Sequence, residues 1–182
     1  MNYYGAKEIA ASFRTVRKNT ITIAEEIGAE HYGFSAASET RTVAQILTHI
    51  ALGPRMALQI HATERRVTLE GFDFQGLFGK LAAEEQALKT KEQIIAVLRE
   101  EGDRFAAWVE GLSEDFLAES VRFLPGMTPP SKTRFEMILG VKEQMHHRAQ
   151  LMLMERMIGI VPHLTREMMA RMAAMQASQA SA

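Results

Sequence analysis

The sequence contains no cysteine, and this absence removes several kinds of chemistry. Without thiols a chain forms no disulfide framework, no thiolate zinc site, no iron–sulfur centre and no cysteine nucleophile. Any metal ion must therefore be bound through nitrogen and oxygen, which leaves the six histidines and the carboxylates as ligands.

Strong net charge and long apolar runs are also missing. The 21 Lys and Arg residues and the 22 Asp and Glu residues give a formal charge of −1, which argues against a general nucleic-acid-binding protein. The longest stretch without a charged residue is 42–54, which is shorter than the roughly 20 residues that cross a bilayer. The N-terminal residues lack the apolar run of a signal peptide. We therefore expect a cytoplasmic protein with neither nucleic acid nor a membrane as partner.

The motifs of several enzyme classes are absent as well. The sequence has no His-Glu-x-x-His motif of zinc proteases, no phosphate-binding glycine-rich loop and no Gly-x-Ser-x-Gly motif. A ferritin-like di-iron centre requires two Glu-x-x-His motifs, whereas only Glu143 and His146 have this spacing. Hydrolase triads, nucleotide-binding loops and di-iron centres are therefore not supported.

Helical periodicity is the dominant pattern in these 182 residues, of which 47% are hydrophobic. Apolar residues recur at three- and four-residue spacing, and long alternating strand patterns are absent. Gly53-Pro54 predicts a break within the second helix. Residues 63–80 and the proline-rich stretch 124–130 are interpreted as connecting loops. The predicted helices are residues 7–27, 42–62, 91–110, 114–118, 134–158 and 165–175.

Three of these helices begin with the spacing of a capping box, in which a threonine and a Glu or Gln three residues later exchange hydrogen bonds. The pairs are Thr42 with Gln45, Thr90 with Gln93, and Thr133 with Glu136. Gly28 and Gly159 are typical of helix ends.

Four long helices with extended connections predict an all-α four-helix bundle, followed by a short extra C-terminal helix. We expect one domain over residues 1–176 and a frayed tail over residues 177–182, because neither a linker nor an internal repeat divides the chain.

Two regions of the sequence place histidines where they could bind a metal ion. Glu143 and His147 are four residues apart, so both side chains leave the same face of the fourth long helix, and His146 lies beside them. His49 lies among apolar residues of the second helix. Each also has a simpler interpretation, because a histidine on an apolar face can be a hydrogen-bonded core residue and a helical glutamate a surface charge.

The remaining histidines carry no such pattern. His31 and His61 lie at predicted helix ends or turns, where we expect surface positions, and nothing marks His163 as a ligand.

The stretch Thr-Val-Ala-Gln-Ile-Leu-Thr-His-Ile-Ala at 42–51, followed by His-His-Arg-Ala-Gln-Leu at 146–151, resembles the DinB/YfiT superfamily. The similarity in layout covers nearly the whole chain. It implies an up-down-down-up four-helix bundle that is commonly dimeric. The typical site of the superfamily takes one histidine from the second helix and two, spaced four apart, from the last long helix. His49 and His147 match this pattern, whereas position 143 is a glutamate instead of a histidine.

Three interpretations of Glu143 follow. His49, Glu143 and His147 can together bind a divalent ion, and the carboxylate then makes any bound water a weaker acid than in an all-histidine site. Alternatively the metal is lost and Glu143 pairs with His147. In the third interpretation Glu143 faces solvent, while the two histidines and another group bind an ion weakly.

The resemblance also implies a cofactor and a class of activity. We expect a divalent metal ion, either zinc, nickel or iron, because these ions accept histidine and carboxylate ligands. Some members of the superfamily are thiol-dependent transferases or related hydrolases, which predicts a metal-dependent enzyme acting on a small molecule. The alternative is a non-enzymatic dimeric bundle that binds a ligand or protein, with the metal site degenerate or purely structural.

Methionine is unusually frequent toward the C-terminus, where nine of the twelve methionines lie from Met137 onward. Methionine fills irregular gaps in a core, which is the simpler explanation. Met168, Met172 and Met175 form one stripe of the last helix, which predicts a contact with a second subunit of a homodimer.

Overall fold

The computed structural model describes residues 4–140 and 145–180, which are mainly helical. The prediction of an all-α fold is confirmed. The four helices that surround the main core are α1 (Ala6–Glu26), α2 (Val43–Leu52), α5 (Lys91–Glu110) and α8 (Met145–Met157).

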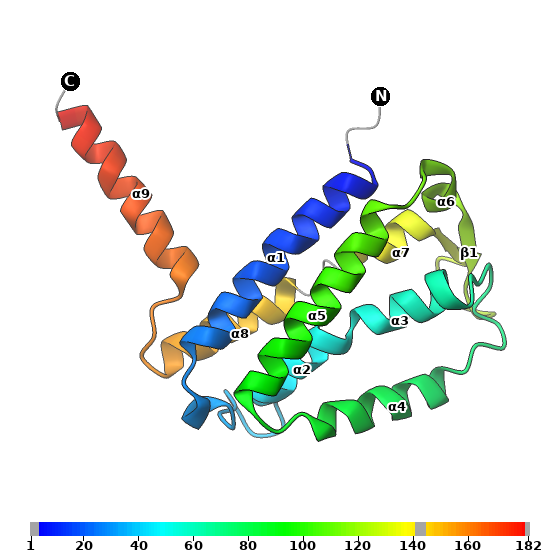
Figure 1. Ribbon diagram of the computed structural model, residues 1–182, viewed down its shortest axis with the longest axis horizontal. Coiled ribbons are helices and arrows are strands. Elements are labelled where there is room, and N and C mark those ends of the chain that lie inside the picture. The colour runs from blue at the N-terminus through cyan, green and yellow to red at the C-terminus, as the bar shows by residue number, and fades with distance from the viewer. Residues whose placement is uncertain (1–3, 141–144, 181–182) are drawn as a thin grey trace.

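These four helices pack as a bundle, in which α1 and α2 each contact both α5 and α8. Figure 1 shows α1 and α5 side by side and running in opposite directions. Buried aliphatic side chains from all four helices meet between them, including Ile23, Leu47, Leu98 and Leu151, each of them fully buried. This core fixes α2 against α8, which is the contact that positions the candidate site.

A second apolar cluster closes the other end of the bundle. It joins α1 and α5 to the short helices α6 (Glu114–Ala118) and α7 (Arg134–Gly140). Phe13 and Phe105 pack here with ring centroids 4.8 Å apart. The bundle therefore has two well-packed ends, and α5 contributes to both.

The three predicted capping boxes are all present. Thr42 and Thr90 each accept a hydrogen bond from the backbone of the glutamine three residues later, and each glutamine side chain accepts one in return. Thr133 makes the equivalent exchange with Glu136 at the start of α7. The starts of these helices were therefore predicted correctly, and α5 also ends where it was predicted to end.

The predicted break at Gly53-Pro54 separates α2 from α3 (Pro54–Leu58), which continues into a π-helical turn, η2 (Gln59–Thr63). Because proline lacks an amide hydrogen, the Ile50 carbonyl loses its partner four residues later. The buried Arg17 replaces that partner, since its guanidinium donates to the Ile50 carbonyl at 2.9 Å and to the Leu98 carbonyl at 3.0 Å. One side chain thus links α1, α2 and α5.

The prediction that residues 63–80 form an irregular connection is wrong for its second half, because α4 (Phe74–Ala87) begins there. Asp73 caps α4 by accepting a hydrogen bond from the Gly76 amide at 2.8 Å. No residue of α4 is fully buried, and Gly76 and Gly79 interrupt its short apolar stripe of Phe74, Leu77, Phe78 and Leu81, so the segment did not stand out as a helix. Arg55 holds α4 on the bundle through ion pairs with Glu84 of α4 and Glu101 of α5.

A short strand pair was not predicted. Strands β1 (Ser120–Arg122) and β2 (Ser131–Thr133) are antiparallel and flank the predicted proline-rich loop. Strands of three residues are too short to show a clear alternating pattern.

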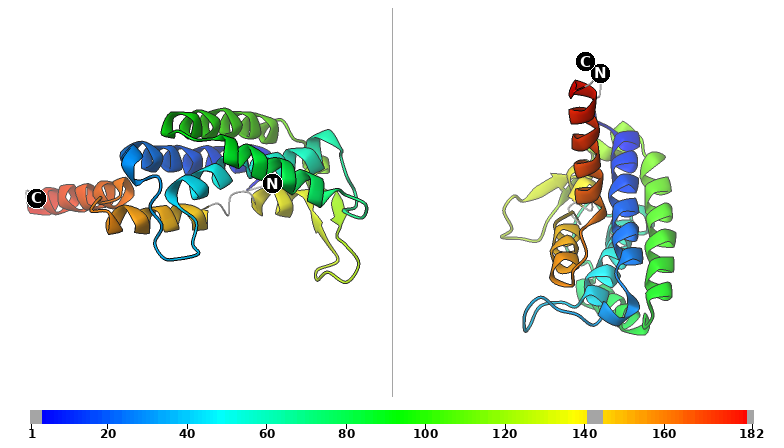
Figure 2. Two further views of the ribbon diagram at one scale, coloured as in Figure 1. Left: turned by 90° about the horizontal axis from the view of Figure 1, so that it is seen from below. Right: turned by 90° about the vertical axis from the view of Figure 1, so that its left-hand side faces the viewer.

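The predicted helix 134–158 corresponds to α7 and α8, and residues 141–144 between them lie outside the described part of the chain. The C-terminal helix α9 (His163–Ala180) has 18 residues, which makes it longer than the predicted 165–175. Figures 1 and 2 show α9 projecting from the bundle. None of the helices in the described ranges combines the length and apolar character needed to cross a membrane.

Candidate metal centre

The packing of α2 against α8 brings His49 and His147 together. The centroids of their imidazole rings are 5.0 Å apart, and the ring planes are nearly perpendicular. Both side chains are partly buried at the surface of the bundle. Two residues that lie far apart in the sequence are thus neighbours, as expected for two ligands of one ion.

The His147 ring is oriented by a residue of its own helix. Its Nδ1 atom lies 2.9 Å from Oε1 of Gln150. Because an amide oxygen only accepts hydrogen bonds, this contact places the proton of a neutral ring on Nδ1 and leaves the lone pair on Nε2. Histidine ligands of metals commonly use the second nitrogen in this way.

The His49 ring has an acidic neighbour that was not predicted. Its Nδ1 atom lies 3.5 Å from Oε1 of Glu85, which belongs to α4. A carboxylate beside Nδ1 favours the tautomer that leaves Nε2 available, as at His147. Glu85 was not predicted as part of the site, because no helix was predicted between the loop 63–80 and the helix 91–110.

Both rings are held in the neutral form near neutral pH. Burial is the main cause that lowers the pKa of His49, and the positive charge of Arg41 lowers it further. The carboxylate of Glu85 raises this pKa and so partly offsets the decrease. Burial likewise lowers the pKa of His147. A neutral imidazole is the form that binds a metal ion, so these environments suit a pair of ligands.

The third predicted ligand, Glu143, lies outside the described residues. His146 is exposed, and its ring centroid is 3.8 Å from that of His147. Within residues 4–140 and 145–180, no three His, Asp or Glu side chains are grouped so that they could hold a metal ion. The described residues therefore contribute two nitrogen ligands, and the three interpretations of Glu143 stay predictions.

A cavity of about 300 Å³ opens beside His147. Its apolar walls include Ile46 of α2 and Leu153 of α8, and its polar groups include Gln150, Thr40 and Arg41. Mainly apolar walls with a few polar groups are typical of small-molecule sites, and the volume is at the lower end of their usual range.

Arg41 is, besides Glu85, a second functional candidate that was not predicted from the sequence. It lies directly before the capping residue Thr42 and forms no ion pair with any residue that the structure describes. A guanidinium without a fixed carboxylate partner can attract an anionic group into the cavity. Nothing in its local sequence distinguishes Arg41 from an ordinary surface charge.

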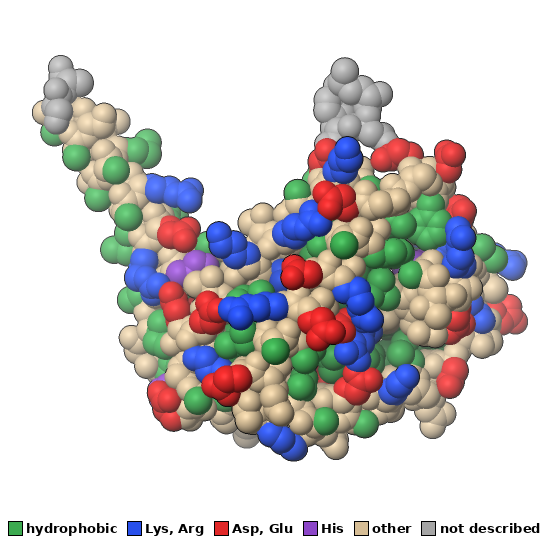
Figure 3. Space-filling model, viewed as in Figure 1, with side chains coloured by type: hydrophobic (Ala, Val, Ile, Leu, Met, Phe, Trp, Pro, Cys, Tyr) green, Lys and Arg blue, Asp and Glu red, His purple; other side chains and the backbone are tan. Residues whose placement is uncertain are grey.

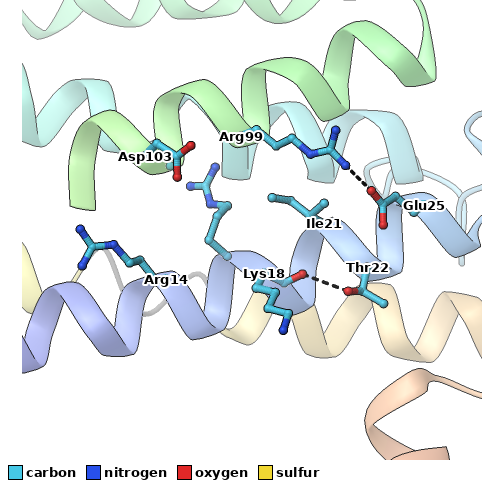
Figure 4. Close-up of a pocket in the computed structure, with 9 residues that line it drawn as sticks. Arg14, Lys18, Ile21, Thr22, Glu25, Arg99 and Asp103 are labelled. Atoms are coloured by element: carbon cyan, nitrogen blue, oxygen red, sulfur yellow. Dashed lines mark hydrogen bonds and ion pairs between the residues drawn. The ribbon is translucent and has the colours of Figure 1, made fainter. Parts of the chain in front are cut away.

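A second cavity, of about 330 Å³, lies between α1 and α5 and is lined mainly by charged residues (Figure 4). Arg99 pairs there with Glu25, and Arg14 pairs with Glu110 at 2.6 Å. Figure 3 shows acidic and basic side chains interspersed over this face. Two of the arginines of this groove are paired with glutamates, so we interpret it as part of an ordinary surface.

The remaining histidines differ in their burial. The His31 side chain is 41% exposed and lies beside Glu30, which agrees with the predicted surface position. The prediction of a surface position is wrong for His61, which is 1% exposed, because it packs against Arg134 of α7. His163 is also buried, where α9 begins. Contacts between distant segments decide these positions, and helical spacing does not reveal them.

The chain is similar to one known protein family and to a solved structure. The model of the DinB family matches residues 1–178. Among solved structures, the chain is similar to a DinB-like protein from Bacillus subtilis, with 18% sequence identity, a TM-score of 0.61, and coverage of 84% of this chain and 92% of that one. At this identity the similarity concerns the fold alone. A search of curated proteins finds no match.

Proposed function

Because the chain belongs to the DinB family, we propose that it binds one divalent metal ion between α2 and α8 through His49, His147 and Glu143. The observation that supports this proposal most directly is the 5.0 Å separation of the two imidazole rings. The acceptors beside both Nδ1 atoms favour tautomers in which Nε2 serves as the ligand atom. Two neutral imidazoles and one carboxylate suit zinc, nickel or iron.

The proposed activity is a metal-dependent transferase or hydrolase reaction on a small molecule, with a thiol as one reactant. Three protein ligands leave a coordination position at which such an ion lowers the pKa of a bound water or thiol. The adjacent cavity supports the proposal, because Ile46 and Leu153 can pack on the organic part of a substrate. Arg41 can bind an anionic group of that substrate and so orient it toward His147.

The metal site is tested by elemental analysis of untagged protein after dialysis. We expect the wild-type protein to retain stoichiometric metal and both His49→Ala and His147→Ala to lose it. His31→Ala is the matched control, since the His31 side chain is partly exposed and does not line the cavity beside His147, and it should retain the metal. Substoichiometric metal that His49→Ala leaves unchanged would show that the proposed site is wrong.

The role of Glu143 needs a separate pair of variants. If Glu143 is a ligand, Glu143→Ala should weaken metal binding, whereas Glu143→His should preserve it with an altered coordination spectrum in cobalt-substituted protein. Unchanged affinity and an unchanged spectrum in both variants would exclude Glu143 from the ligand set.

The enzymatic part is tested with metal-loaded protein, free cysteine and a soluble alkyl bromide, by following the loss of thiol. In this reaction a carbon–sulfur bond forms, bromide leaves and the thiol proton passes to solvent. We expect wild-type protein to accelerate the reaction and His49→Ala to be inactive. Equal rates would contradict the enzymatic proposal for this class of thiol reaction.

The alternative is a non-enzymatic dimeric bundle, and α9 provides a specific observation in its favour. Met168, Met169, Met172 and Met175 of α9 are each more than half exposed. Figure 3 shows hydrophobic side chains along this projecting helix. A helix of this kind is typical of an interface, so binding of a second subunit accounts for it without any catalysis.

A further inference from the structure

A further concave site lies at the far end of the bundle from the candidate metal centre and shares no residue with it. This depression has a volume of about 460 Å³ and is formed by η2, the end of α5 and the start of α6. Figure 1 shows α6 beside the end of α5, well away from α2 and α8. We call it the α5–α6 site, defined by His61, Arg65, Trp108 and Phe116, which line it with four smaller neighbours.

His61 gives the α5–α6 site a fixed hydrogen-bond donor. Its Nδ1 atom lies 3.0 Å from a guanidinium nitrogen of Arg134, and because a guanidinium only donates, Nδ1 accepts and the proton is on Nε2. Burial and the charge of Arg134 lower the pKa of His61 to about 4, so the ring is neutral. Within the described part of the chain, no acceptor binds the Nε2 hydrogen.

Arg134 holds this ring firmly in place. It is 1% exposed, its Nε atom lies 2.8 Å from a carboxylate oxygen of Glu119, and its guanidinium lies 4.6 Å from the centroid of the Phe116 ring. The charge of Arg134 is thus balanced by Glu119. The donor on His61 is oriented by buried contacts, as in sites that are formed before a ligand arrives.

Arg65 supplies a positive charge that is not balanced. Its guanidinium lies 5.6 Å from the centroid of the Phe116 ring, and it forms no ion pair with the residues that the structure describes. Its backbone has a φ of 48°, a left-handed conformation that is uncommon outside glycine. Such conformations, and π-helical turns such as η2, occur preferentially at functional sites.

The remaining lining determines which ligand fits. Trp108 and Phe116 provide aromatic surfaces, and the indole N–H of Trp108 has no acceptor among the described residues. No carboxylate lines the depression. The site therefore combines hydrogen-bond donors, one unbalanced cation and two aromatic rings, which complement a flat anion.

We propose that the α5–α6 site binds a small aromatic carboxylate. The ring of the ligand packs against Trp108 and Phe116, and its carboxylate accepts hydrogen bonds from Arg65 and from Nε2 of His61. A long-chain acid fits less well, because the depression is open and few aliphatic side chains line it.

Trp108 is the only tryptophan of the chain, so its indole N–H resonance reports on this site alone. The full-length protein is titrated with benzoate and followed by two-dimensional NMR. We expect a saturable shift of the indole resonance, and Arg65→Gln should weaken benzoate binding roughly tenfold, the effect of losing one charge-assisted contact. Arg65 is exposed, so this variant should fold, which the unchanged remainder of the spectrum verifies.

Arg99→Gln, in the separate groove between α1 and α5, is the matched control and should bind benzoate as the wild-type protein does. Benzyl alcohol and inorganic phosphate test the two parts of the proposed ligand, and both should bind more weakly than benzoate. Absence of a saturable benzoate shift, an Arg65→Gln affinity equal to that of the wild-type protein, or equal binding of either comparison compound would overturn the proposal.

Discussion

Glu155, on α8, is a fully buried carboxylate at the point where α9 leaves the bundle. Neither of its side-chain oxygens has a hydrogen-bond partner among the described residues. Burial is the main cause that raises the pKa of Glu155 to about 7, and the negative charge of Glu26 raises this pKa further. The positive charges of Arg166 and Arg156 lower the pKa and so partly offset the rise. Leaving a buried carboxylate unpaired destabilises the folded state when the group is ionised.

This environment predicts a pH dependence of stability. The pKa of Glu155 is higher in the folded than in the unfolded protein. The carboxyl group therefore contributes most to the free energy of unfolding below the unfolded pKa of 4.5, and this contribution is lost as the pH rises to about 7. We expect Glu155→Gln to be more stable than the wild-type protein at pH 8, by on the order of 2 kcal/mol, and to lose that advantage at pH 5.

Urea unfolding across this pH range measures the difference between the two proteins. Contributions from other groups, such as the buried His61, are common to both and cancel. Glu167→Gln, at an exposed position of α9, is the control and should show no such trend. A difference that does not change between pH 5 and pH 8 would contradict the assignment.

Single residues also show what could be predicted about the candidate site. His49 and His147 were identified from helical spacing and family resemblance, both of which are properties of local sequence. Glu85 and Arg41 were missed, because their proximity to the site depends on how α4 and the loop before α2 pack. The burial of His61 against Arg134 depends on a contact across 73 residues of sequence, which periodicity does not detect.

At the scale of helices and strands, a helix boundary could be predicted from the sequence wherever side chains close to that boundary in the sequence determine it. The capping boxes at Thr42, Thr90 and Thr133 are local interactions, so their sequence pattern was sufficient. Helix α4 was missed because Gly76 and Gly79 interrupt its apolar spacing, and glycine weakens a helix. The ion pair of Glu84 with Arg55, which helps to hold α4 on the bundle, joins segments that lie apart in the sequence, so no local pattern reveals it.

The capping box of α5 predicts a measurable loss of stability. Thr90→Ala removes the side-chain acceptor for the Gln93 amide, and we expect unfolding free energy to fall by about 1 kcal/mol. The comparison variant is Thr15→Ala, at an exposed position within α1, where the threonine hydroxyl only donates to the Ala11 carbonyl. Alanine has the higher helix propensity there, so this variant should be neutral or slightly more stable. Equal losses in urea unfolding would argue against the cap.

At the scale of the whole molecule, the most unusual feature is α9, which extends from the bundle and contacts mainly α1. An 18-residue helix exposed on nearly all sides is marginally stable in water, because helix formation alone contributes little free energy. Its methionines Met168, Met169, Met172 and Met175 are each more than half exposed. This exposed apolar surface supports the prediction that a second copy of the chain covers α9.

Light scattering coupled to gel filtration tests this prediction. We expect the wild-type protein to be a dimer and the double variant Met168→Glu, Met172→Glu to be a monomer, because two charges would have to be buried at the interface. Met127→Glu places the same charge at another exposed methionine, in the loop between β1 and β2, and should remain dimeric. A wild-type monomer at high concentration would contradict the prediction.

The hydrogen bonds by which Arg17 of α1 links α2 and α5 have a consequence for how the protein unfolds. A proline break such as Gly53-Pro54 commonly marks a hinge at which one half of a helix can open alone. Here the freed Ile50 carbonyl is bound by a side chain of α1 that also binds α5, so the break cannot open without disrupting both neighbours. The amides that flank the break should therefore exchange with solvent only through unfolding of the whole bundle, as part of one cooperative unit.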